Sequence, residues 1–146
     1  MNREILDFIK QQRVGVLAVE MMDGSPHAAT VHIANSETPL MFFFETNRDY
    51  RKCEPLFGRQ LTRASLVIGF DESSARTLQL DGQVRLLKGE EEQKSFREIY
   101  LEKYPNKKAK FADPKFVPFV FVPAWWRWTD WTKPAGKIIL TSVDAN

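Results

Sequence analysis

Residues 42–52 read Phe42-Phe43-Phe44-Glu45-Thr46-Asn47-Arg48-Asp49-Tyr50-Arg51-Lys52, and they join a strongly β-prone run to a polar segment. The aromatic residues predict a buried strand over residues 40–44. Thr46 or Asn47 then caps a predicted helix over about residues 48–57, which closes at Gly58. This segment is therefore predicted to be a buried strand that leads directly into a capped helix.

The start of this predicted helix combines the features of a phosphate site. The first turn of a helix presents N–H groups that lack an intrahelical partner, at the positive end of the helix dipole. Arg51 can bind an anion through two parallel hydrogen bonds, and Lys52 adds a second positive charge. The alternative is a capped surface helix whose basic side chains are solvated.

Short apolar runs separated by turn residues extend in both directions from this segment. Antiparallel strands with short turns and few helices predict a mainly β fold, a small barrel with three peripheral helices, in one domain over residues 1–146. An Asp23-Gly24 hairpin signal joins the first two strands, and Gly82 marks a bend. The predicted helices are 3–12, 48–57 and 90–104; the predicted strands are 14–19, 26–34, 40–44, 65–70, 77–87, 119–132 and 137–142; a turn covers 35–39 and a basic connection covers 105–118.

Composition excludes several classes of protein. The chain has 146 residues, 43% of them hydrophobic, and 21 basic against 19 acidic side chains give a net charge of only +2. A strongly basic nucleic-acid-binding protein is therefore not expected. A single cysteine, Cys53, excludes an internal disulfide and a thiolate metal cluster, and it favours a reducing, cytoplasmic setting. The sequence contains no run of 18 apolar residues, so it predicts no membrane-spanning helix. The N-terminal residues do not resemble a signal peptide.

Several segments together resemble the pyridoxamine 5′-phosphate oxidase family of FMN-binding split β-barrels. Thr46-Asn47 followed by Arg51-Lys52 is similar to the family segment Thr-Asn-x-x-Ser-Arg-Lys. The Asp-Gly hairpin precedes a strand that opens with Pro-His, and Gln79-Leu80-Asp81-Gly82 is similar to Gln-x-x-Glu-Gly. The order and spacing of these segments agree with the family over about residues 5–90.

The resemblance implies a cofactor, its binding residues and an assembly. Arg51 and Lys52 would hold the phosphate of FMN, with Thr46 and Asn47 nearby. Gln79 would approach the cofactor from the second subunit of a homodimer, with FMN at the interface. The isoalloxazine ring would lie along the second strand, flanked by Ala29, Thr30, Val31 and His32.

Two departures from the family pattern bear on the substrate. Tyr50 stands where the motif has serine, so one short phosphate donor is replaced. The Arg-x-x-x-x-Lys of the oxidase itself corresponds to Ala29 and Ala34, which cannot bind a phosphate through their side chains. We therefore expect a planar, weakly charged substrate rather than pyridoxine or pyridoxamine 5′-phosphate.

All four tryptophans lie within residues 125–131. On a strand, Trp126, Trp128 and Asp130 point to one face and the residues between them to the other. Each face is expected to meet the core, a subunit interface or a stacked ligand. Such residues more often pack in a core or an interface than on a ligand. Trp128 is the candidate for stacking on the cofactor.

The remaining polar residues give weaker signals. His27 and His32 stand five residues apart, so they point to opposite faces of a strand and lack metal-ligand spacing. His32 lies on the proposed flavin wall, for a structural hydrogen bond or for proton transfer. Cys53 is expected to be a buried apolar residue. The lysines Lys103, Lys107, Lys108, Lys110 and Lys115 form either a solvated loop or a surface that attracts an anion.

These observations favour an FMN-dependent oxidoreductase that acts on a small molecule, with no identified catalytic side chain, no metal, no nucleic-acid partner and no membrane association. Hydride or electron transfer would be carried by the flavin. One alternative is a non-catalytic module that binds flavin or haem. A second alternative, a barrel that binds single-stranded nucleic acid, has little electrostatic support.

Overall fold

A computed structural model of the chain describes residues 1–69 and 71–143. Phe70, which belongs to the predicted strand 65–70, lies outside the described residues, as do residues 144–146. The strands are β1 Val14–Glu20, β2 Pro26–His32, β3 Ala34–Glu37, β4 Leu40–Asn47, β5 Thr62–Ile68, β6 Arg76–Leu86, β7 Phe116–Asp130 and β8 Ile138–Thr141. The helices are α1 Arg3–Gln11, α2 Glu54–Gly58 and α3 Glu90–Lys103, with short 3₁₀ helices η1 Arg51–Cys53, η2 Glu72–Ser74 and η3 Pro105–Ala112.

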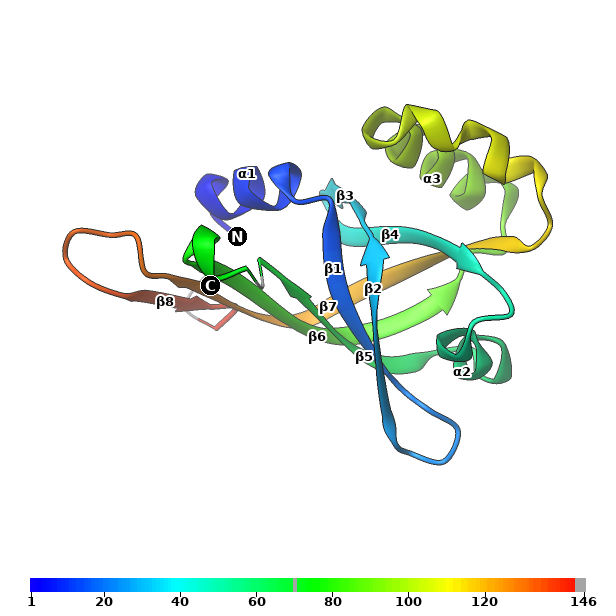
Figure 1. Cartoon of the computed structure of the whole chain (residues 1–146), viewed down its shortest axis with the longest axis horizontal. Coiled ribbons are helices and arrows are strands. Elements are labelled where there is room, and N and C mark those ends of the chain that lie inside the picture. The colour runs from blue at the N-terminus through cyan, green and yellow to red at the C-terminus, as the bar shows by residue number, and fades with distance from the viewer. Residues whose placement is uncertain (70, 144–146) are drawn as a thin grey trace.

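The strands form one antiparallel sheet in the order β2-β1-β5-β6-β7-β4-β3, and β8 pairs with β7. The two end strands, β2 and β3, follow one another in the chain and are separated only by Ile33. The sheet must therefore curl until its two ends approach each other, and it forms a split β-barrel (Figure 1). The expected fold class is confirmed. No helix in the described part of the chain is long and apolar enough to cross a membrane.

The main core fills the concave side of this sheet. In β1 the buried residues alternate with half-buried ones, so Leu17 and Val19 face the inside. Phe8 of α1 closes one end of the barrel and meets the ring of Trp128 edge-on, with 4.7 Å between the ring centroids. The burial of the tryptophan segment does not follow the expected alternation: Trp128, Thr129 and Asp130 are all buried, and the three residues before them are all half-buried.

A second apolar cluster lies between α3 and the β3–β4 hairpin. Phe96 and Tyr100 are the buried residues of α3, and Phe96 packs against Phe43 of β4. Tyr104, directly after the helix, donates its hydroxyl hydrogen to the carbonyl oxygen of Ile33 over 2.9 Å. This cluster fixes α3 outside the barrel, next to the chain segment that links β2 to β3.

Three local predictions need correction, although the predicted boundaries elsewhere differ by three residues or fewer. Residues 35–37, predicted as part of a turn, form a separate short strand with Ala34, because β4 supplies hydrogen-bonding partners along its edge. The predicted helix 48–57 is η1 followed by the single turn α2, because Pro55 has no N–H and suits only a first turn. Part of the predicted connection, residues 105–112, is the 3₁₀ helix η3.

Gly82 is expected to be required where β6 bulges against β7. The register shifts between Asp81 and Gly82, and a Cβ on Gly82 would lie 2.1 Å from the carbonyl oxygen of Val122. We predict that Gly82→Ala lowers the free energy of unfolding by roughly 1–3 kcal/mol, because the backbone of β7 must move. Urea unfolding measures this, with Gly89→Ala as the control, since the nearest atom there is 3.9 Å away. Equal stability of the two variants would contradict the prediction.

Candidate functional site

The segment after β4 turns sharply and then enters η1. The side-chain oxygen of Asn47 accepts a hydrogen bond from the backbone N–H of Asp49 at 2.9 Å. The carbonyl oxygen of Asn47 accepts one from the N–H of Tyr50 at 3.2 Å. This turn directs Lys52 and Cys53 toward the barrel and leaves Arg51 at the surface.

Lys52 is the most unusual residue of this segment. It is only 6% exposed, and burial lowers the pKa of its amine. The Nζ atom lies 4.6 Å from the ring centre of Tyr50. Within the described residues no carboxylate lies at ion-pair distance from it. A partly desolvated ammonium group without a carboxylate partner is costly, and an anion that enters from solvent would offset that cost.

Arg51 and Thr46 complete the cationic end of the site. Arg51 is exposed, and it contributes, after the hydrogen bonds from Ser25, to the lowered pKa of the Asp23 carboxyl group. The tip of the β1–β2 hairpin therefore lies within electrostatic range of η1. Thr46 is 5% exposed, and the carbonyl oxygen of the next residue, Asn47, accepts a hydrogen bond from the thiol of Cys53 over 3.4 Å.

Cys53 is buried beneath this site, as expected from the sequence. Burial raises the pKa of its thiol to about 11. At pH 8 the reactive thiolate is then about 1 in 1,000 molecules, against roughly a quarter for a free cysteine. We predict that iodoacetamide labels native Cys53 very slowly at pH 8 and labels it readily in urea, as measured by intact mass. Rapid labelling of the native protein would contradict this geometry.

The β2 strand supplies a flat wall beside η1. Thr30 and His32 face outward, while Ala29 and Val31 face the barrel, where Val31 is 5% exposed. Among the described strands β2 pairs only with β1, so one edge of its backbone is free to bond a ligand. Burial, together with Lys107 and Arg13, lowers the pKa of His32, so its imidazole is neutral at pH 7. His27 faces the opposite way from His32, as predicted.

A polar cluster next to His32 was not predicted. The carboxylate of Glu45 is buried and pairs with Lys107 at 3.5 Å and with Lys110 at 3.8 Å. Lys107 also donates to the hydroxyl of Tyr100 over 3.1 Å. Two of the lysines that were predicted to form either a solvated loop or an anion-attracting surface therefore bind a buried carboxylate of the chain itself. No short-range pattern signals this, because Glu45 and Lys107 lie on β4 and η3.

Two other predicted site residues, Gln79 and Trp128, do not lie beside η1 and β2 in the structure. Gln79 is exposed on the outer face of β6, opposite Val67 and Arg127. Two strands, β1 and β5, separate it from β2 within one chain. Trp128 is a correction to the sequence-based list: it is 1% exposed and packs on Phe8, so it offers no face to a ligand.

The structure resembles solved structures of low sequence identity. A haem-binding protein from Mycobacterium smegmatis has a TM-score of 0.73 and 18% identity; the match covers 94% of this chain but only 56% of that protein. A protein related to general stress protein 26 from Clostridium acetobutylicum has a TM-score of 0.69 and 15% identity, with 98% and 95% covered. The haem storage protein of Vibrio cholerae has a TM-score of 0.70 and 16% identity, with 82% and 87% covered. No curated protein matches the chain.

A sequence profile is more specific than these structural similarities. The profile described as pyridoxamine 5′-phosphate oxidase matches residues 1–130, which is most of the chain. The matched region contains the barrel, the Thr46–Lys52 segment and the β2 wall. This protein belongs to the pyridoxamine 5′-phosphate oxidase family.

Proposed function

We propose that this protein is a flavoprotein that binds FMN without a covalent bond and serves as an oxidoreductase. The observation that supports this most strongly is Lys52, a largely buried lysine whose amine has no carboxylate partner in the described residues. It lies in the segment that resembles the phosphate-binding motif of the family. A phosphate at this place would receive charge from Lys52 and a paired set of donors from Arg51.

The rest of the cofactor would extend along β2. Thr46 and Asn47 would border the phosphate, and the free edge of the strand would hydrogen-bond the rim of the isoalloxazine ring. Thr30 and His32 would present their side chains toward it, while Ala29 and Val31 would contribute backbone groups. A neutral His32 suits this position because an uncharged imidazole can both donate and accept a hydrogen bond.

Bound FMN would supply the hydride or electron transfer, and the chain would bind and orient the reactants. We propose a small planar substrate rather than a pyridoxine vitamer phosphate. Ala29 and Ala34 provide no charge for a second phosphate, and Ala34 is buried. Lys107 and Lys110 are both paired with Glu45, which balances one of their two positive charges.

The absorption spectrum of the purified protein, before and after incubation with FMN, tests the cofactor. Flavin bands that stay with the protein through gel filtration are expected. Bleaching by NADH or NADPH without air, followed by recovery in air, would support an oxidoreductase rather than a passive binder. Pyridoxine and pyridoxamine 5′-phosphate should not be oxidised. Turnover of either at about 1 per second or faster would refute the substrate proposal.

A non-catalytic haem-binding module is the second candidate. Two of the similar solved structures are described as haem-binding or haem storage proteins, and this is the observation that favours it. Titration with haemin distinguishes the two functions. A haem absorption band that survives gel filtration, with no retained FMN, would replace the flavin proposal.

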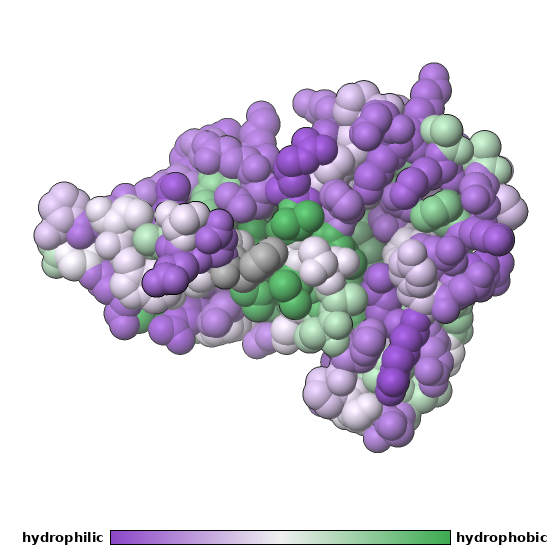
Figure 2. All heavy atoms as spheres, viewed as in Figure 1, coloured by the Kyte–Doolittle hydropathy of each residue, from purple (hydrophilic) through white to green (hydrophobic). Residues whose placement is uncertain are grey.

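We also propose a homodimer in a cytoplasmic setting, with Gln79 reaching the FMN of the partner subunit. The outer face of β1 and β5 carries half-buried Val14, Val16, Ala18 and Val67. Figure 2 shows an apolar patch at the centre of one face of the molecule, surrounded by hydrophilic side chains. Exposed apolar patches of this kind mark subunit contacts. Sedimentation velocity at micromolar concentration should show a dimer, and a monomer would contradict both the assembly and the role of Gln79.

A further inference from the structure

A separate pocket of about 280 Å³ lies between α1, β3 and α3. Its lining comes from all three elements: Lys10, Ala34, Asn35, Glu37, Ile99, Glu102 and Lys103. None of these residues is among those proposed to bind FMN, and Ala34 is the one position of the lining that also bears on the substrate proposal above. This volume is slightly below the range of ligand pockets, which is about 300–1,000 Å³, so an occupant must be small.

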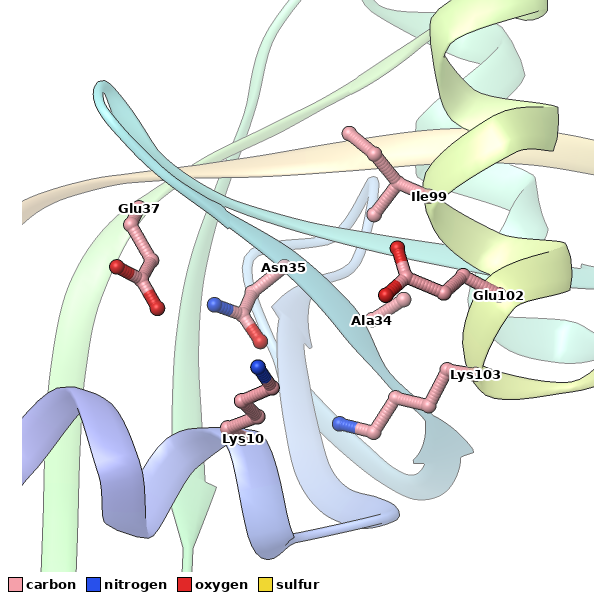
Figure 3. Close-up of a pocket in the computed structure, with 7 residues that line it drawn as sticks. All are labelled: Lys10, Ala34, Asn35, Glu37, Ile99, Glu102 and Lys103. Carbon is pink, nitrogen blue, oxygen red and sulfur yellow. The ribbon is translucent and has the colours of Figure 1, made fainter.

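Lys103 is the group in this pocket that lacks a partner. Its Nζ atom is buried and has no hydrogen-bond partner within the described residues. Figure 3 shows the amines of Lys10 and Lys103 directed into the same space, next to the side-chain amide of Asn35. Two amines therefore converge there from α1 and α3, and the one on Lys103 is desolvated, while the Asn35 amide turns its oxygen toward Lys10 and its nitrogen donates to the carbonyl oxygen of Ser36 at 3.5 Å.

The charges around the pocket favour an anion with one negative charge. Lys10 and Lys103 face it, and Arg13 is close enough to lower the pKa of Lys103 further after burial, to about 8. Glu37 is already paired with Arg3 at 3.1 Å. Glu102, the other carboxylate that lines the pocket, forms no ion pair within the described residues. The balance is positive but modest, and a nearby carboxylate disfavours a dianion. Ala34 and Ile99 offer apolar surface for a short carbon chain.

We propose that this pocket is a binding site for a small organic carboxylate, held between the amines of Lys10 and Lys103. The carboxylate would supply the hydrogen-bond acceptor that the buried amine lacks. Its carbon chain would lie against Ile99 and Ala34. The site is independent of the proposed flavin chemistry.

Protein-observed NMR with butyrate as the probe tests this, using the signals of Ala34 and Ile99 as reporters. Butyrate should shift both signals with a Kd in the millimolar range. Butyramide, which has the same shape without the charge, and inorganic phosphate should bind at least fivefold more weakly. Absence of shifts with butyrate, or equal affinity for butyramide or phosphate, would overturn the proposal.

Variants separate the pocket from general surface charge. Lys103→Gln should weaken butyrate binding about tenfold, while Lys103→Arg should largely keep it and so guards against loss of fold. Lys108→Gln, on exposed η3, is the matched control and should change the Kd less than twofold. Butyrate binding should also weaken as the pH rises from 7 to 9.5, because Lys103 loses its proton near pH 8. A Lys103→Gln variant that binds as well as the parent protein would refute the site.

Discussion

Lys52→Met is expected to weaken FMN binding by about 10–150-fold while the cofactor-free protein stays at least as stable as before. The loss corresponds to roughly 1.5–3 kcal/mol, the usual contribution of a hydrogen bond to a charged group. The amine of this largely buried side chain is partly desolvated and has no carboxylate partner in the described residues, so an apolar side chain of similar length removes a desolvation cost from the empty protein. Quenching of FMN fluorescence measures the affinity, and urea unfolding measures the stability.

Lys88→Met is the control for this experiment, because Lys88 is exposed and lies outside the site. It should leave both quantities unchanged. An unaltered Kd for Lys52→Met, and for the double variant Arg51→Ala with Lys52→Ala, would show that this segment does not bind the FMN phosphate. Unfolding of Lys52→Met would show instead that the lysine is a structural residue.

Trp128→Ala is expected to lower the free energy of unfolding by about 3–5 kcal/mol, the range for removal of a large aromatic side chain from a core. Trp128 is 1% exposed, and its ring meets Phe8 of α1. Its loss leaves a cavity under that helix and removes much of what holds α1 on the barrel. Because domains are stabilised by only about 5–15 kcal/mol in total, urea unfolding will show the change clearly.

Trp131→Ala provides the matched control, three residues further along the chain. Trp131 is 51% exposed, and its hydrogen bond to Ala75 comes from the backbone N–H, which alanine retains. Its cost should stay within about 0.5 kcal/mol. Trp128→Phe should fold and bind FMN with unchanged affinity, since the buried indole does not reach the site. A loss below 1 kcal/mol for Trp128→Ala would contradict the core assignment.

The strands of this protein were largely predictable because their burial follows a period of two, or because they are β-branched and aromatic. The exceptions depend on distant partners. Residues Ala34–Glu37 have no strong β propensity, and they form a strand only because β4 lies beside them. The helix after β4 was overestimated, since Pro55 limits it to a short turn.

The residues of the candidate site could be predicted from a sequence motif, but their burial and their ion-pair partners could not. Thr46, Asn47, Arg51 and Lys52 could be named from their order and residue types, because a phosphate needs such donors. The burial of Lys52 could not, since it depends on how η1 packs. The pairing of Glu45 with Lys107 was hidden for the same reason: 62 positions separate the two residues, and only the tertiary fold joins them.

The position of β4 in the sheet has a consequence for how the chain reaches its fold. Phe42, Phe43 and Phe44 pair with Phe121, Val120 and Phe119 of β7, nearly 80 residues later. During synthesis at 5–20 residues per second, this aromatic run must wait about 4–16 s before its partner strand has been made. Such non-local pairing also slows folding in the test tube, to milliseconds or seconds.

Until β7 arrives, the run Leu40-Met41-Phe42-Phe43-Phe44 can pair with β3 along one edge, but its other edge is an uncharged apolar template for association between chains. Glu45 follows it immediately, and the same carboxylate that later pairs with Lys107 and Lys110 is free at this stage to act as a gatekeeper. Refolding yield should therefore fall steeply with protein concentration, and more steeply in Glu45→Gln, whereas a chain lacking β7 should aggregate rather than remain a soluble half-barrel.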